Sequence, residues 1–350
     1  MLGIRLFVLR LFMVELPALA HGSSNATPVI LDTDMGNDID DALALVMLHT
    51  LQSSGECEIL GITLSKDNPW AAIYTEQVNR FYGRPQIPIG AVQRGATPDE
   101  GPFIRRIPEL FGEKCFSRKP DDAVTLLRRM LSSQPDQSVV ILTIGFLTNM
   151  SRLLNSLPDA DSPLDGMELF SRKVNRVCSM AGSFRPGKAV GPDSGNPEYN
   201  IRTDIPAARS FFGRCPRPVV FSGFEVGAAI VFPGAFIEKA LAENPGNPVA
   251  AAYAAYLPMP YDRPCWDQSA VLQAIRPNAG YFRLSDPGCV TVDSSGQSGF
   301  INDPDGLHRY LILDEENVPR IRREILDLCS MGSHLTAQPK IVSKDLFLQL

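Results

Sequence analysis

Five aspartates stand among ten consecutive residues, 32 to 41 (DTDMGNDIDD), with no lysine or arginine between them. The run before them, PVIL, is apolar, and the run after them, ALALVML, has apolar residues at helical spacing. The cluster is therefore predicted to lie where a buried strand ends and a helix begins. Carboxylates this close repel one another, and something must offset the repulsion. A bound cation, the helix N-terminus, sugar hydroxyls or exposure to water could each do so.

Short apolar runs alternate with longer amphipathic ones along the chain. Strands are predicted at residues 28–34, 57–65, 87–91, 138–145, 174–182 and 218–223, and helices at 40–52, 70–82 and 121–131 and after 148 and 204. This order predicts an α/β fold with a mainly parallel, doubly wound (Rossmann-like) sheet and helices on both faces. Ligands of such sheets bind beyond the carboxyl ends of the strands. Polar clusters do follow these runs, for example at residues 66–68 and 143–149.

The composition excludes some classes of function. The 350 residues carry a net charge of −6 and a pI near 5.4, without a basic cluster interleaved with aromatics. Nucleic-acid binding is not expected, because phosphate backbones require a basic surface. The seven cysteines show neither a CxxC pair nor zinc-ligand spacing. No stretch after residue 20 is long and apolar enough to span a bilayer.

The first twenty residues, MLGIRLFVLRLFMVELPALA, resemble an export signal with a basic start, an apolar run and small residues before a cleavage point. Export to the periplasm or the extracellular space is expected if this signal is genuine, and a cytoplasmic location otherwise. A misplaced start or an N-terminal extension is the alternative.

The aspartates favour a hard cation. Asp40 and Asp41 are placed at the helix start, where unpaired N–H groups offset part of their charge. Asp32 and Asp34 end the strand and face them across a turn at Gly36. Oxygen ligands without histidine or cysteine favour calcium or magnesium over zinc.

Two known aspartate motifs fit poorly. An EF-hand loop starting at Asp32 would need glycine and glutamate where Asn37 and Leu43 stand. A haloacid-dehalogenase-type phosphatase also has DxD after a strand, but Gly36 occupies a place where that motif normally has threonine or valine.

Six segments in order resemble the inosine-uridine-type nucleoside hydrolases. The family pattern DxDxGxDDxxA is similar to residues 32–44, where two residues are added between Gly36 and the aspartate pair. The other matching segments are ILGITLSKDN ending at Asn68, IGFLTN at 144–149, MAG at 180–182, EYN at 198–200 and WDQSAV at 266–271. The resemblance predicts a domain at residues 28–313, a C-terminal helix and tail at 314–350, and a homodimer or homotetramer.

The resemblance implies calcium-dependent hydrolysis of the N-glycosidic bond of ribonucleosides or a related N-riboside, releasing base and ribose. Asp34 would activate a calcium-bound water as the general base, and Asp32 would orient the metal ligands. The metal ligands implied are Asp34, Asp41, Asp267 and the main-chain oxygen of Ile144. The substrate-binding residues implied are Asp40, Asn68, Met180, Asn196, Glu198, Asn200 and Trp266.

Trp266 departs from the family pattern, because many members have histidine there as the proton donor to the leaving base. An indole N–H does not ionise near neutral pH, so Trp266 is expected to stack on a base or sugar, or only to pack. A second hypothesis is therefore a nucleoside- or sugar-binding protein with little or no turnover. The phosphatase is the third and least favoured.

Overall fold

The computed structural model describes residues 26–112, 119–184 and 197–330. The predicted signal at residues 1–20, Asn196, and the tail after residue 330 lie outside the described residues. None of the described cysteines forms a disulfide. No helix in the described ranges has the length and apolar character needed to cross a membrane.

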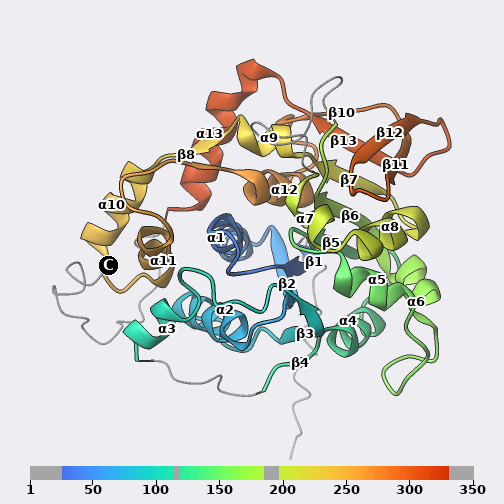
Figure 1. Ribbon diagram of the computed structural model, residues 1–350, viewed down its shortest axis with the longest axis horizontal. Coiled ribbons are helices and arrows are strands. Elements are labelled where there is room, and N and C mark those ends of the chain that lie inside the picture. The colour runs from blue at the N-terminus through green and yellow to red at the C-terminus, as the bar shows by residue number, and fades with distance from the viewer. Residues whose placement is uncertain (1–25, 113–118, 185–196, 331–350) are drawn as a thin grey trace, which may run out of the picture.

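Within the described ranges, 11 strands form one sheet that runs through the molecule (Figure 1), and its centre is parallel. The order there is β7 (Val219–Ser222), β6 (Val174–Met180), β5 (Val139–Thr143), β1 (Thr27–Thr33), β2 (Cys57–Lys66), β3 (Ile89–Ala96) and β4 (Asp121–Asp122). The predicted α/β fold is thereby confirmed. The two apolar runs with the strongest β character, at β1 and β5, are direct neighbours in the middle of the sheet.

Helices cover both faces of this sheet. One face carries α1 (Asp40–Ser53), α2 (Pro69–Phe81), α3 (Arg106–Leu110), α10 (Gly234–Glu243), α11 (Pro248–Tyr256), α12 (Trp266–Ile275) and α13 (Val318–Leu328). The other carries α4 (Ala123–Ser132), α5 (Thr148–Leu154), α6 (Gly166–Lys173) and α8 (Ile205–Arg214). Because strand side chains alternate between faces, Val29 and Leu31 enter the first core and Ile30 enters the second.

One edge of the sheet is antiparallel, and the alternation of apolar runs did not predict it. There β13 (His308–Ile312) pairs in parallel with β7 and antiparallel with β11 (Gly288–Val292), which pairs with β12 (Ser298–Asn302). The short β10 (Arg283–Leu284) joins β13, and β8 (Val231–Phe232) and β9 (Arg263–Pro264) form a separate pair. These strands are short and half exposed, so they lack the continuous apolar runs of the central strands.

The C-terminal helix α13 belongs to the same core as α1. Ile321, Ile325 and Leu328 are buried in that core, and Cys329 Sγ lies 3.8 Å from the main-chain oxygen of Leu43. Although α13 comes after the predicted domain of residues 28–313 in sequence, it packs into the core of that domain.

Candidate active site

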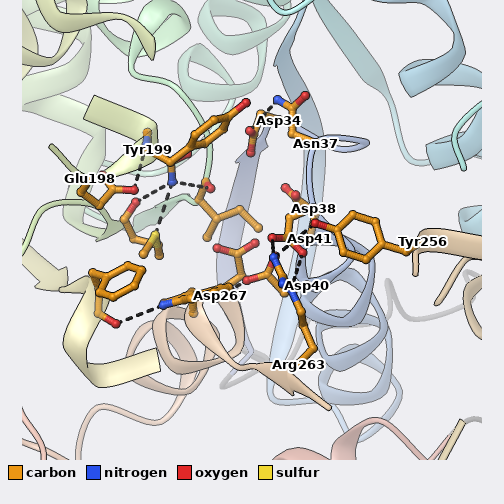
Figure 2. Close-up of a pocket in the computed structure, with 15 residues that line it drawn as sticks. Asp34, Asn37, Asp38, Asp40, Asp41, Glu198, Tyr199, Tyr256, Arg263 and Asp267 are labelled. Carbon is orange, nitrogen blue, oxygen red and sulfur yellow. Dashed lines mark hydrogen bonds and ion pairs between the residues drawn. The ribbon is translucent and has the colours of Figure 1, made fainter. Parts of the chain in front are cut away.

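A cavity of about 320 Å³ lies where β1, β5 and β6 end. Parallel strands with helices on both faces expose their carboxyl ends at a common edge, which is where ligands of such folds bind. Figure 2 shows carboxylates from the first and last thirds of the chain around this cavity. Its lining residues are Asp34, Asn37, Asp38, Asp40, Asp41, Ile144, Met180, Glu198, Tyr199, Asn200, Phe224, Tyr256, Arg263, Trp266 and Asp267.

Three buried carboxylates meet on one side of the cavity. Asp40 and Asp41 begin α1, Asp267 lies in the first turn of α12, and one oxygen from each lies within 4.8 Å of the others. The two helices pack together with their N-termini at the cavity, and the main-chain N–H of Asp267 donates to Asp40 Oδ2 over 3.3 Å. Burial, and then the negative charge of the neighbouring aspartates, raises the pKa of all three groups.

Asp34 lines the same cavity but stands outside this group of three. Its Oδ2 accepts a hydrogen bond of 2.8 Å from Asn37 Nδ2, and Asn37 Oδ1 accepts one of 2.7 Å from the buried Lys66 Nζ. Burial raises the pKa of Asp34 to about 6, partly offset by the hydrogen bond from Asn37. The described carboxylate cluster thus contains Asp40, which we expected to bind sugar, in addition to the expected ligands Asp41 and Asp267.

Asp32 lies beneath the cavity and does not line it. Thr63 Oγ1 and Asn149 Nδ2 donate to its Oδ1 over 2.6 and 2.8 Å, and Thr143 Oγ1 lies 3.4 Å from its Oδ2. Burial raises the pKa of Asp32 to about 7, although these hydrogen bonds act to lower it. Asp32 therefore ties the end of β1 to β2, β5 and α5, which agrees with a role in orienting other residues.

Glu198 and Asn200 border the cavity from the start of α7 (Tyr199–Thr203). The carboxylate of Glu198 caps this helix, accepting from the N–H groups of Asn200, Ile201 and Gly182, and burial raises its pKa to about 7. Asn200 Nδ2 donates to the main-chain oxygens of Ile144 and Met180, each over 3.0 Å.

Asn68 is a predicted sugar-binding residue that the structure does not bring to the cavity. Its Oδ1 accepts from the N–H of Trp70, capping α2, and its Nδ2 donates to the main-chain oxygen of Pro98 over 2.7 Å. The side chain is thus held by the start of α2 and a neighbouring loop. Asn196, another predicted sugar ligand, lies outside the described residues.

Trp266 lines the cavity, and its indole N–H already donates a hydrogen bond within the protein. Nε1 donates to the main-chain oxygen of Phe224 over 3.0 Å, and the two rings lie 5.4 Å apart. Gly227 permits this arrangement, because a Cβ there would lie 2.3 Å from the Cα of Trp266. With the N–H engaged, contacts of Trp266 with a ligand would come from the ring.

Six cavity residues were missed by the sequence interpretation: Asn37, Asp38, Tyr199, Phe224, Tyr256 and Arg263. Three carried a signal, since Asn37 and Asp38 lie inside the aspartate motif and Tyr199 stands between Glu198 and Asn200. The other three lie in segments with no recognisable pattern. They reach the cavity because the tertiary structure brings the start of α9 (Phe224–Ala228), the end of α11 and β9 to it.

Comparison with known proteins agrees with the expected family. The sequence model described as "Inosine-uridine preferring nucleoside hydrolase" matches residues 29–309. The chain is 31% identical over 251 residues to the pyrimidine-specific ribonucleoside hydrolase RihA of Salmonella agona, covering 66% of this chain and 70% of that protein. These matches carry the resemblance well beyond the six motifs.

Solved structures show the same fold. A plant nucleoside hydrolase, PpNRh1, superposes with a TM-score of 0.65 at 22% identity, covering 86% of this chain and 98% of that one. The inosine-uridine preferring nucleoside hydrolase of Bacillus anthracis gives a TM-score of 0.65 at 17% identity, covering 87% and 100%. At these identities the superpositions support the architecture of the sheet and its helices.

Proposed function

The chain belongs to the inosine-uridine preferring nucleoside hydrolase family and is a hydrolase of N-glycosyl compounds, and we propose that it cleaves ribonucleosides with calcium bound at Asp40, Asp41 and Asp267. The observation that carries the proposal is the meeting of these three buried carboxylates beside a cavity large enough for a nucleoside. Family membership also removes the haloacid-dehalogenase-type phosphatase from consideration.

The residues present fit a divalent cation. Among the described residues, none of the three carboxylates forms an ion pair with a lysine or arginine, although each is at most 3% exposed. Buried charges without a partner are costly, and a cation would offset both the burial and the mutual repulsion. The donors are all oxygen atoms, which calcium and magnesium prefer. Asp34 and Ile144, whose main-chain oxygen the family resemblance implies as a ligand together with Asp34, Asp41 and Asp267, line the same cavity.

When bound, the cation would lower the pKa of a coordinated water and orient the sugar hydroxyls. Asp34 would accept the proton of the attacking water, with its carboxylate held by Asn37. Glu198 and Asn200 would position the sugar from the α7 side of the cavity. As the C–N bond breaks, positive charge develops on the ribose, and the surrounding carboxylates would stabilise it.

The experiment is a nucleoside panel assayed for free ribose, with and without a chelator. We expect hydrolysis of pyrimidine ribonucleosides, the substrates in the name of the relative RihA, and loss of activity with chelator. Asp34→Ala should abolish turnover. Activity that survives both treatments would contradict the proposal.

The binding-protein hypothesis remains the second candidate, because Trp266 occupies the place of the usual proton donor and its N–H is engaged by Phe224. Nucleoside binding measured by calorimetry without any release of ribose would favour it. Export of the chain and assembly into a homodimer or homotetramer stay predictions, to be checked by fractionation of the producing cells and by light scattering.

A further inference from the structure

Asp38 lies in the two-residue insertion of the aspartate motif, and in the wall of the cavity it forms an ion pair with Arg263, 225 positions later. Arg263 Nε donates to Asp38 Oδ1 over 2.9 Å, and Nη2 donates to Asp38 Oδ2. Nη2 also lies 3.2 Å from the hydroxyl of Tyr256. Such a two-point contact fixes the plane of a guanidinium more firmly than a single hydrogen bond does.

Two aromatic rings hold the same guanidinium. Its central carbon lies 5.1 Å from the ring centre of Trp266 and 5.2 Å from that of Tyr256. Trp266 is itself fixed by its hydrogen bond to Phe224. Burial disfavours the charged form of Arg263, but the hydrogen bonds and charge of Asp38 outweigh it and raise its pKa, so the group stays charged.

In the part of the chain that the structure describes, one nitrogen of this guanidinium donates no hydrogen bond. Among the described residues, Arg263 Nη1 has no hydrogen-bond partner, although Nε and Nη2 both do. Figure 2 shows Arg263 pointing toward Asp38, beside Asp40. A charged donor is therefore fixed in the cavity wall, next to the aromatic ring that replaces the family's usual proton donor.

We propose that Arg263 is the residue that stabilises the departing base, by donating a hydrogen bond from Nη1 to an acceptor atom next to the glycosidic nitrogen. This inference rests on the proposed function. In a pyrimidine the acceptor is O2, and in a purine it is N3. Asp38 is the positioning residue, and Trp266 supplies the surface against which the guanidinium and the base lie.

The step balances without a proton donor at position 266. The C1′–N bond breaks, its electron pair leaves with the base, and the attacking water supplies the hydroxyl at C1′ while Asp34 takes its proton. The base departs as an anion hydrogen-bonded to Arg263, which keeps its own proton, and the base then gains a proton from solvent. A preorganised charged donor aimed at developing negative charge is an effective form of electrostatic stabilisation.

The test compares two ribosides whose leaving groups differ in how much stabilisation they need as the glycosidic bond breaks. Uridine has a poor leaving group, whereas p-nitrophenyl β-D-riboside releases a stable anion unaided. We expect Arg263→Met to lower kcat/KM for uridine by about 100-fold or more, the size typical of losing one such donor. For the nitrophenyl riboside we expect a loss of less than about 5-fold, because its leaving group does not need this donor.

Arg263→Met leaves the charge of Asp38 without its partner, and a second variant controls for the effect of that charge. The double variant Asp38→Asn with Arg263→Gln removes both charges together and should show the same selective loss. Asp38→Asn alone should give a smaller selective loss, because it loosens Arg263 without removing it. Arg105→Gln is the matched control, since Arg105 also lies over a tryptophan, Trp70, and pairs with acidic residues, but away from this cavity. It should leave both substrates unaffected.

The outcomes separate this inference from the proposed function. If the wild type hydrolyses neither riboside, the proposed function is wrong and the inference falls with it. If the wild type hydrolyses both, and the folded Arg263 variants lose activity equally on the two or on neither, only the inference is overturned. A selective loss on uridine supports it.

Discussion

Lys66 donates a hydrogen bond from Nζ to Asn37 Oδ1 over 2.7 Å. Asn37 in turn donates to Asp34, so a buried lysine on β2 holds the carboxylate that we propose as the general base. Lys66 also donates to the main-chain oxygen of Thr97 over 3.0 Å and pairs with Asp99 at 3.5 Å. The insertion therefore connects the aspartate motif to two basic residues, Lys66 through Asn37 and Arg263 through Asp38.

Lys66→Met should lower kcat/KM for nucleosides by about 10- to 100-fold, because Asn37 loses the partner that fixes its amide against Asp34. Steady-state kinetics with uridine would measure this. Asp99→Asn is the control: that carboxylate is exposed, and exposed ion pairs contribute little. An equal effect of both variants would argue against the connection through Asn37.

Calcium should raise the thermal stability of the protein, because it binds only where Asp40, Asp41 and Asp267 come together in the folded state. At a concentration 100 times its Kd, the stabilisation would be about 2.7 kcal/mol, which corresponds to a rise in Tm of about 3–6 °C. Differential scanning calorimetry with and without calcium tests this. Asp267→Asn should remove the rise, whereas Asp136→Asn, which alters an exposed ion pair, should keep it. A rise that persists in Asp267→Asn would place the cation elsewhere.

Gly145→Ala should destabilise the site and the fold together. A Cβ at Gly145 would lie 2.4 Å from the main-chain nitrogen of Asp34 and 2.6 Å from Ser65 Oγ, so β1 and β2 would have to move. We expect a loss of about 1–3 kcal/mol in the free energy of unfolding, measured with urea, and a loss of hydrolysis. Gly213→Ala is the contrast, because no atom of the described residues outside its own stretch of helix would lie within 4 Å of a Cβ there. That change within helix α8 should be neutral or stabilising by up to about 1 kcal/mol.

Trp266→Ala should raise KM for nucleosides by about 10-fold, since the ring face against Arg263 and the substrate is lost. Trp266→Phe keeps a ring but not the hydrogen bond to Phe224, and we expect less than about a 3-fold change. Steady-state kinetics on both variants separates the two contributions. An equal effect of the two variants would mean that the indole N–H, which both of them lack, matters more than the ring.

His49 should contribute a loss of stability in mild acid. Burial, and then the charge of Arg84, lowers the pKa of His49 to about 3, although its hydrogen bond with Asn79 opposes the shift. The unfolded chain takes up this proton below pH 6.5 and the folded protein does not, so stability is lost as pH falls from 6.5 toward 3. Between pH 7 and pH 5 this loss is about 2 kcal/mol.

Urea unfolding at both pH values would measure the His49 contribution, with His49→Gln as the comparison. The variant should lose less stability between pH 7 and pH 5 than the wild type does. His308, whose pKa burial also lowers, titrates in both proteins and cancels. An identical pH dependence in the two proteins would show that another group is responsible.

The sequence by itself determined the order of the central elements and the place of the first aspartates. The apolar run before Asp32 and the helical pattern from Asp40 are local, and β1 and α1 begin or end within a residue of the predicted bounds. Local periodicity reports which face of a strand or helix is buried, and the parallel sheet follows from repeated alternation of the two.

The tertiary structure decided which side chains meet. Family resemblance pointed to Asp267, but no local pattern joins Arg263 to Asp38. The antiparallel edge at β11 to β13 could not be predicted from local sequence patterns either, because its strands are short and half exposed. Contacts between residues more than 200 positions apart depend on strand order, register and the paths of loops. Those are set by how the whole core packs, and short-range periodicity carries no information about them.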